Sequence, residues 1–243
     1  MDRRKFLKIT GLSLAGLTIQ PAFRLFSKPE QKRWAMVINL DACSKKDGCR
    51  DCIDACHRVH NVPDLANPKD EVKWIWNAPF ERVFGGQGYT TLNEVLKNRS
   101  VLVLCNHCEN PPCVKVCPTK ATWKREDGIV MMDYHRCIGC RYCMAACPYG
   151  ARSFNWKDPR PSINEINMDF PTRMKGVVEK CNFCEERLAK NLLPACVEAC
   201  EEKGLIFGDL NATDSDVRKI LKSKFSILRK PHLGTEPKIY YIL

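Results

Sequence analysis

All sixteen cysteines of this 243-residue chain fall into four groups of four. Each group ends in the same spacing, Cys-x-x-x-Cys, so the cysteines form an internal repeat. The groups are Cys43, Cys49, Cys52 and Cys56; Cys105, Cys108, Cys113 and Cys117; Cys137, Cys140, Cys143 and Cys147; and Cys181, Cys184, Cys196 and Cys200. A chain of this length forms one large domain or two small ones. Here the domains would fold around the groups that the cysteine thiols bind.

Disulfides, zinc sites and iron–sulfur clusters all use cysteines, and the third group distinguishes between them best. It reads Cys137-x-x-Cys140-x-x-Cys143-x-x-x-Cys147-Pro148, which is the ligand run of bacterial ferredoxins. Disulfides do not require successive x-x spacings, because each bridge joins two thiols in a fixed geometry. Structural zinc sites use cysteine pairs that are separated by a longer loop. We therefore favour iron–sulfur clusters over zinc or disulfides.

The other three groups lengthen one spacer of the same run. The second group has two extra residues before Cys113, and the fourth has an eleven-residue spacer before Cys196. The first group has a five-residue spacer before Cys49. Sixteen thiolates suffice for four clusters, so the sequence predicts four [4Fe–4S] clusters whose iron is held by cysteine alone.

The net charge of +11 would ordinarily indicate a negatively charged partner such as nucleic acid or anionic lipid. A [4Fe–4S] cluster with four thiolates carries about −2 when oxidised, so four clusters bring the loaded chain to about +3. We therefore expect no nucleic-acid partner, and we expect basic residues beside the ligands to offset the cluster charge. These residues are Lys115, Lys120, Arg136 and Arg141.

Residues 1–27 are predicted to be an export signal. Arg3 and Arg4 precede Lys5-Phe-Leu-Lys8 and a mildly apolar stretch, as in twin-arginine signals. A basic amphipathic arm is the alternative. Asp2 departs from the usual Ser or Thr and no clear cleavage site follows, so an attached anchor is also an open possibility. No window of 18 uninterrupted apolar residues occurs, which predicts no membrane-spanning helix.

Short strands are expected between the cysteine loops. Residues 34–40 are rich in strand formers and lead into the first group, and residues 204–210 give another strand and turn. Residues 122–132 are typical of a hairpin, in which Asp127 and Gly128 supply the two positive-φ positions of a tight turn.

A helix is expected after Thr213 or Asp214, either of which would be its N-cap. Its apolar face consists of Val217, Ile220, Leu221 and Phe225. Residues 61–104 hold no cysteine and form the largest insertion, with five aromatic residues. This insertion is either a lid that shields the first cluster from water or a docking surface for a partner subunit. The aromatic residues are Trp74, Trp76, Phe80, Phe84 and Tyr89.

Three histidines, His57, His107 and His135, lie within two residues of ligand cysteines. They either tune a potential and couple a proton to electron transfer, or form hydrogen bonds within their own loops. We favour the second role. The sequence has no nucleophile–base pair, nucleotide-binding loop or Cys-x-x-Cys-His haem motif, so we expect an electron carrier without catalytic residues.

Over nearly its whole length the chain resembles the four-cluster electron-transfer subunits of molybdopterin-type respiratory enzymes, the dimethyl sulfoxide reductase-type and NrfC-like family. The resemblance lies in the four ordered cysteine groups, Cys108-x-x-Pro-Pro-Cys113, Phe207-Gly-Asp-Leu and Leu233-Gly-Thr-Glu-Pro-Lys-Ile-Tyr-Tyr. The twin-arginine signal, Cys43-x5-Cys49, Cys56-His-Arg-Val-His60 and Asn67-Pro-Lys-Asp-Glu-Val look closest to the DsrO branch, from the membrane-bound Dsr complex of sulfate reducers.

The resemblance implies an α+β fold of two pseudo-symmetric bacterial-ferredoxin-like modules with loop insertions and a C-terminal helix. Residues 33–60 together with 175–243 would form one module, and residues 105–157 the other. The fourth cysteine of each group would cross to the neighbouring cluster. The implied ligand sets are Cys43, Cys49, Cys52 and Cys200 (cluster 1); Cys105, Cys108, Cys113 and Cys147 (cluster 2); Cys137, Cys140, Cys143 and Cys117 (cluster 3); and Cys181, Cys184, Cys196 and Cys56 (cluster 4).

The implied function is a relay of single electrons. The implied partners are a multi-span quinone-interacting (NrfD-like) membrane subunit and a cytochrome c or other redox subunit. The setting would be dissimilatory sulfur metabolism on the extracytoplasmic face of the cytoplasmic membrane, where partners or the uncleaved N-terminus would hold the folded, exported protein. The alternative is the equivalent subunit of a polysulfide-, tetrathionate- or nitrite-reductase-type complex, and a distant one is a zinc-binding basic adaptor.

Overall fold

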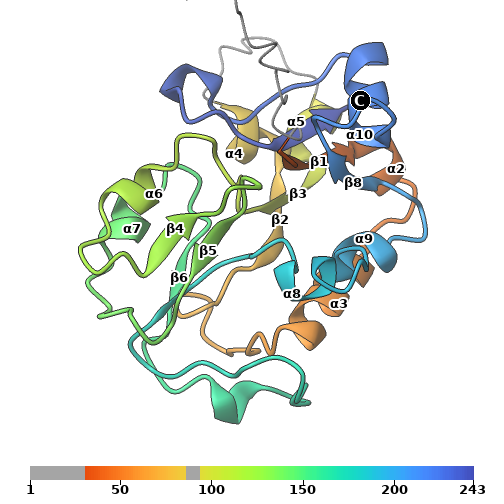
Figure 1. The fold of residues 1–243 in the computed structure, drawn as a ribbon. Coiled ribbons are helices and arrows are strands. Elements are labelled where there is room, and N and C mark those ends of the chain that lie inside the picture. Colours follow the sequence, from red (N-terminus) through yellow and green to blue (C-terminus); the bar gives the residue numbers. More distant parts are fainter. Residues whose placement is uncertain (1–30, 86–93) are drawn as a thin grey trace, which may run out of the picture. The chain divides into compact units, whose positions relative to one another are not determined.

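The computed structural model describes residues 31–85 and 94–243, and the fold below belongs to the unit that spans residues 32–243. The predicted export signal at residues 1–27 and Tyr89 lie outside the described residues. The helices and strands of the described part are short and are joined by long loops (Figure 1). No helix in this part is long and apolar enough to cross a membrane.

The strand β1 (Trp34–Asn39) is the centre of a three-stranded sheet that joins the two ends of the described chain. It pairs antiparallel with β8 (Leu205–Asp209) and parallel with β9 (Ile239–Ile242). Residues 35–38 are fully buried, because Met36 and Ile38 face the main core while Ala35 and Val37 face a smaller core. The strands predicted at 34–40 and 204–210 are confirmed.

The helix α10 (Asp216–Ser223) packs on this sheet, but its ends differ from the prediction. Its N-cap is Ser215, so neither Thr213 nor Asp214 caps it. Val217 is fully buried against the sheet, and the other two predicted face residues within the helix pack beside it. Phe225 is 85% exposed, because the helix ends two residues before it and its side chain leaves the apolar face.

The strands β4 (Thr122–Lys124) and β5 (Val130–Met132) form the predicted hairpin, but its turn is wider than predicted. The Arg125 N–H donates to the carbonyl oxygen of Ile129, and the Gly128 N–H donates to that of Arg125. Gly128 has a φ of 88°, whereas Asp127 is not in the left-handed region and instead accepts from the Ile129 N–H. The side chain of Asp127 thus stabilises a longer loop where the two-residue turn was expected.

The predicted insertion supplies β2 (Ile75–Pro79) and β3 (Ser100–Leu104), which form a separate antiparallel pair. The helices α4 (Phe80–Phe84) and α5 (Glu94–Asn98) follow β2 in the sequence. Trp74 is fully buried, and its ring stacks on that of His60 with 4.5 Å between the centroids. This contact holds the start of the insertion against the end of the first cysteine helix.

Four helices carry the repeated cysteine spacing. They are α3 (Asp51–Val59), α6 (Pro112–Lys115), α7 (Tyr142–Ala145) and α9 (Ala195–Glu198). The helix α3 packs against α9, and α6 packs against α7 (Figure 1). The remaining elements are α2 (Leu40–Cys43), β6 (Ser153–Phe154), the 3-10 helix η3 (Arg160–Ser162), β7 (Val178–Glu179), which pairs with β6, α8 (Glu185–Leu188) and the 3-10 helix η4 (Pro231–Leu233).

Candidate metal centres

The repeated Cys-x-x-x-Cys spacing amounts to one turn of helix. Residues four apart lie on the same helix face, about 6 Å from each other. Cys52 and Cys56 both lie on α3, and Cys113 lies on α6 with Cys117 just beyond its end. One helical turn separates the two cysteines of each such pair, and they belong to different spatial sets of four cysteines, numbered sets 1 to 4 below.

Set 1, which consists of Cys43, Cys49, Cys52 and Cys200, lines an open cavity of about 640 Å³. Burial raises the pKa of Cys43 to about 11, and the nearby thiols of Cys200 and Cys49 add to this effect. Asn98 and Arg99, from the insertion, form part of the wall. The described part of the insertion therefore borders this cavity.

Set 4 consists of Cys56, Cys181, Cys184 and Cys196, and all four are buried. Burial raises the pKa of Cys56 well above its ordinary value, and the other three thiols of the set raise it further. Backbone N–H groups orient two of the sulfurs: Phe183 donates to Sγ of Cys181 at 3.5 Å, and Ala195 donates to Sγ of Cys184 at 3.4 Å.

Set 2 consists of Cys105, Cys108, Cys113 and Cys147, which line a narrow cavity together with Tyr149 and Arg152. Burial raises the pKa of Cys108 to about 12, with contributions from the other three thiols. Arg152 donates from Nη2 to Sγ of Cys113 at 3.1 Å. A charged donor on a cysteine sulfur is expected to stabilise the thiolate form.

Set 3 consists of Cys117, Cys137, Cys140 and Cys143, and it lies nearest the surface. Cys140 is the one exposed cysteine of the sixteen, and its neighbours Ile138 and Tyr142 are 66% and 64% exposed. Gly139 adopts a φ of 69°, and a Cβ there would lie 2.4 Å from the carbonyl oxygen of Gly176. The ligand loop therefore requires glycine at this position.

The four sets fit iron–sulfur clusters in the number and chemistry of their ligands. Thiolates are the ligands of [4Fe–4S] clusters, four to a cluster. The raised pKa values arise because ionised thiols would bring negative charges together in a dry interior. A positively charged iron core removes this penalty, since metal binding and thiol deprotonation are coupled.

The sets follow one another in a row, in the order 1, 4, 2, 3. Sets 1 and 4 share α3, which carries Cys52 and Cys56, and sets 2 and 3 share α6, which carries Cys113 with Cys117 just beyond its end. Sets 4 and 2 meet where the ring of Phe183, between Cys181 and Cys184, stacks on that of His107, between Cys105 and Cys108, with 3.8 Å between the centroids. Every set therefore adjoins the next, and sets 1 and 3 are the two ends of the row.

Two buried cations beside these sets were missed by sequence reasoning. Arg152 and Lys180 are both buried, whereas the four basic residues that were expected to offset cluster charge are all exposed. Lys180 directly precedes Cys181, and Arg152 lies five residues after Cys147. Proximity to ligand cysteines was the available signal, but it does not distinguish buried from exposed basic residues.

His60 is the histidine in closest contact with a cysteine set, and the sequence did not single it out. Its Nδ1 lies 2.9 Å from the carbonyl oxygen and 3.7 Å from Sγ of Cys56, and its Nε2 lies 2.9 Å from Oε1 of Glu186. His60, Cys184 and Glu186 bring potential ligand atoms within 4.8 Å of one another. Because Cys184 belongs to set 4, this group is part of that site.

The three histidines that the sequence did single out make looser contacts with the cysteine sets. His107 is buried and accepts at Nδ1 from the N–H of Val130 on β5 at 3.0 Å, so this bond reaches a distant strand and does not stay within its own loop as favoured. Its ring stacks on Phe183, with 3.8 Å between the centroids. His135 is exposed and His57 is half-buried.

A buried ion pair supports set 4 from the side of the insertion. Arg173 Nη2 and Glu179 Oε2 lie 2.6 Å apart, and both side chains are fully buried. Trp74 donates from Nε1 to the same carboxylate at 2.9 Å, and Arg173 also donates to the carbonyl oxygen of His60. These bonds pair the two buried charges and fix the end of α3.

The sequence matches known iron–sulfur proteins. Two models of a 4Fe–4S dicluster domain match residues 100–163 and 136–206. The Hdr-like menaquinol oxidoreductase iron–sulfur subunit 1 of Archaeoglobus fulgidus is 39% identical over 99% of this chain and 97% of its own length. The iron–sulfur cluster-binding subunit of a menaquinone reductase from Nitratidesulfovibrio vulgaris is 37% identical (86% and 88%), and a tetrathionate reductase subunit of Salmonella typhimurium is 34% identical (99% and 88%). The protein therefore binds multiple [4Fe–4S] clusters, and its sixteen cysteines are consistent with four.

Proposed function

We propose, since this protein belongs to the family of iron–sulfur electron-transfer subunits of oxidoreductase complexes, that it relays single electrons through four [4Fe–4S] clusters. The electrons pass between a quinone-interacting membrane subunit and a redox partner outside the cytoplasm. The observation that carries this proposal is the row of four cysteine sets, each adjoining the next.

Each set holds one cluster, so the fourth cysteine of every sequence group binds the other cluster of its pair. The cavity linings support this assignment: Cys147 lines the cavity of set 2, Cys117 that of set 3, and Cys200 that of set 1. The helix pairs α3 with α9 and α6 with α7 support a pseudo-symmetric arrangement of two modules. When bound, the clusters supply the one-electron chemistry, and the chain positions and insulates them.

The two ends of the row are the places where partners exchange electrons. Set 1 opens into its large cavity, and set 3 is bordered by the exposed side chain of Ile138, while the exposed Tyr142 directly precedes Cys143. Trp156, 45% exposed, extends this apolar surface, and Arg141 lies 4.8 Å from the centre of its ring. Exposed aromatic and arginine side chains are common in protein interfaces. No catalytic residue is assigned, because the function needs none.

The names of the relatives favour a quinone-linked complex in sulfur metabolism. Relatives are named for menaquinol oxidation and menaquinone reduction, and a polysulfide reductase chain from Wolinella succinogenes is 35% identical over 87% of this chain. A DsrO-type role in sulfate reduction fits these names and the motifs of the sequence. The second candidate is the equivalent subunit of a tetrathionate- or polysulfide-reductase-type complex, which the relatives of that name support. The predicted export signal favours a position on the extracytoplasmic face of the membrane in either role.

The test uses the intact complex, extracted without oxygen from native membranes. The protein should be brown, contain about four irons for every four cysteines, and bleach when a reduced menaquinone analogue is added. Identification of the co-purified subunits distinguishes the two candidate complexes. A colourless protein with stoichiometric zinc, or clusters that exchange electrons with neither a reduced nor an oxidised menaquinone analogue, would contradict the proposal.

A further inference from the structure

The two buried cations found beside the cysteine sets occupy related positions. Arg152 is buried between set 2 and set 3: it lines the cavity of set 2 and donates to Sγ of Cys113 at 3.1 Å, and its neighbour Met132 lines the cavity of set 3. Its remaining contacts are with neutral groups, Thr122 Oγ1 at 2.8 Å and Met132 Sδ at 3.7 Å. A guanidinium group stays charged in proteins, so this is a fixed positive charge.

Lys180 lies in the corresponding position between set 4 and set 2. It is 1% exposed, and its Nζ donates to the carbonyl oxygens of Val130 and Cys181, the latter at 2.7 Å. Lys180 directly precedes Cys181 of set 4, and Val130, which accepts its hydrogen bond, lines the cavity of set 2. Burial lowers the pKa of this amino group, whereas the negative charge of the neighbouring Cys105 and Cys181 thiolates favours the ammonium form.

Neither cation has a carboxylate partner among the described residues; their charged neighbours are thiols and each other. A buried charge without a counter-ion is very costly, and buried Arg and Lys are ordinarily paired. The ion pair between Arg173 and Glu179 shows the ordinary arrangement in the same molecule. The anions that compensate Arg152 and Lys180 must therefore be supplied by the thiolate-bound clusters themselves.

We propose that Arg152 and Lys180 are fixed inter-cluster charges that make the cluster of set 2 the most easily reduced of the four. This inference rests on the proposed function, because it needs a cluster in each set. A nearby positive charge stabilises the reduced cluster, which carries one more negative charge, and so raises its reduction potential.

The other sets lack this double compensation. Set 4 adjoins Lys180 but also Glu186, whose carboxylate lies within 4.8 Å of Sγ of Cys184. Set 3 adjoins Arg152 but lies at the surface, where water screens the charge. In set 1, Sγ of Cys49 lies 3.5 Å from the carboxylate of Asp51. Set 2 alone is buried between both cations.

The test is a reductive titration of the purified holoprotein, followed by electron paramagnetic resonance, in Arg152→Met and Lys180→Met variants. Arg152→Met should lower the potentials of the clusters in sets 2 and 3, and Lys180→Met those in sets 2 and 4. One signal should therefore shift in both variants, and in the unmodified protein it should be the first to appear. At a fixed solution potential, the ratio of reduced to oxidised cluster for this signal should fall at least tenfold. This corresponds to a drop of about 59 mV in the potential of a one-electron couple.

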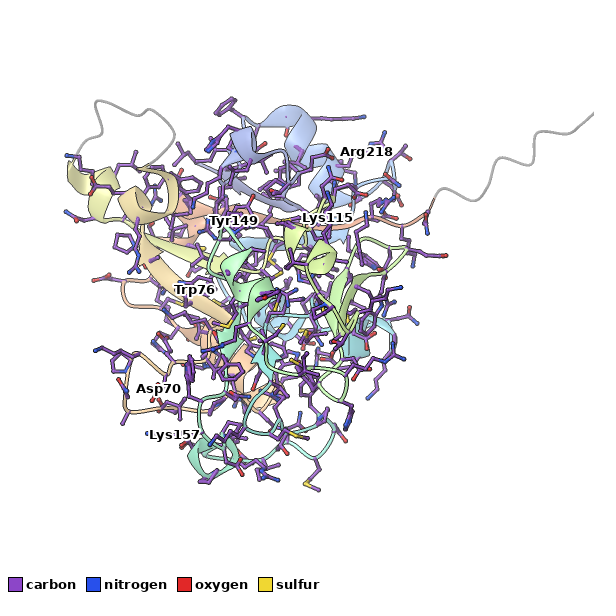
Figure 2. All side chains as sticks on the ribbon, turned by 90° about the vertical axis from the view of Figure 1, so that its left-hand side faces the viewer. Asp70, Trp76, Lys115, Tyr149, Lys157 and Arg218 are labelled. Carbon is purple, nitrogen blue, oxygen red and sulfur yellow. The ribbon has the colours of Figure 1, made fainter. Side chains whose placement is uncertain are left out.

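Two further variants separate charge from packing. Arg152→Lys keeps the charge and should retain most of the potential. Lys157→Met removes a charge from a side chain that is 78% exposed and should shift no signal. Lys157 lies at the lower edge of the view in Figure 2, whereas Tyr149, which borders set 2, lies near its centre.

The outcomes separate this inference from the proposed function. Full iron content with unshifted potentials in both methionine variants, or shifts that share no signal, would overturn the inference and leave the relay intact. Fewer than four clusters in the unmodified protein would overturn the relay. If Arg152→Met loses iron, the other two variants decide the question. Lys180→Met must then lower two potentials, and Arg152→Lys must leave the potentials unchanged.

Discussion

His60 and Glu186 lie 2.9 Å apart, Nε2 to Oε1, although 126 residues separate them in the sequence. His60 is the C-cap of α3, and Glu186 lies on α8. On its other side the imidazole contacts Cys56, while Glu186 follows Cys184 by two residues. The pair therefore links the first and last cysteine groups directly beside set 4, where the proposed ligand crossing takes place.

The crossing predicts different losses from two cysteine variants. Cys200→Ser should damage the cluster of set 1 while set 4 keeps four cysteines, and Cys56→Ser should do the reverse. Sets 2 and 3 should keep their clusters in both variants. Spectroscopy that resolves the clusters by reduction potential checks this. Loss of the same signal in both variants would mean that each sequence group binds its own cluster.

A single methyl group at Gly204 should disturb set 1. A Cβ there would lie 2.9 Å from Sγ of Cys43 and 3.4 Å from its backbone nitrogen. We expect Gly204→Ala to lower the iron content by one cluster or to shift one potential, because the sulfur must move. Gly85→Ala is the control, since among the residues that the structure describes its Cβ would meet the flexible side chain of Glu81 at 3.5 Å. Normal iron and potentials in Gly204→Ala would contradict this packing.

Removal of Arg173 should strongly destabilise the protein. Arg173→Met leaves the fully buried carboxylate of Glu179 without its cation, which costs on the order of 3–5 kcal/mol. The urea concentration at which the visible absorption disappears should fall. Arg160→Met, which removes an exposed partner of Asp158, should change stability by less than about 0.5 kcal/mol. Equal effects of the two substitutions would show that the buried pair is unimportant.

The exposed surface above set 3 should matter for a partner and not for folding. Tyr142→Ser changes a side chain that is 64% exposed, so iron content and stability should stay normal. Quinol-dependent reduction in the assembled complex should slow, because interfaces depend on a few aromatic contacts. Phe225→Ser is the matched control, because it removes an aromatic side chain that is 85% exposed just after α10. An unchanged rate in Tyr142→Ser would remove this surface from the proposed contact.

Export should depend on the paired arginines of the predicted signal. Replacing Arg3 and Arg4 with lysine should leave the folded, iron-loaded protein in the cytoplasm, because the twin-arginine receptor reads that pair. Cell fractionation, with Lys8→Arg as the control, measures the result. Normal export of the double variant would favour the amphipathic-arm interpretation of this segment.

Local pattern was sufficient to predict the cysteine repeat and several strands. The spacing of cysteines four apart is a property of one helical turn, and residues 34–40 are continuous strand formers, so both could be read without a structure. The cap at Ser215 and the wide turn at Asp127 differ from prediction because several nearby Ser, Thr and Asp residues can serve the same local role.

The polar contacts around the sets could not be predicted in the same way. Arg152 meets Cys113 across 39 residues, and Arg173 meets His60 across 113. Such partners are brought together by tertiary packing, and a single basic residue in a sequence gives no sign of whether it will be buried. Arg141 directly follows Cys140 and is exposed, whereas Arg152 is farther from any ligand cysteine in the sequence and is buried, so only the fold distinguishes them.

The strand order β8–β1–β9 also affects how the protein folds during its synthesis on the ribosome. The central strand emerges first, but its neighbours, residues 205–209 and 239–242, emerge last. At a synthesis rate of about 5–20 residues per second, Trp34 waits roughly 10 to 40 seconds for the strand that contains Tyr241. During that interval a strongly apolar strand has both edges bare, which favours association with other polypeptides. A nascent chain of this kind needs protection until its last residues have been translated.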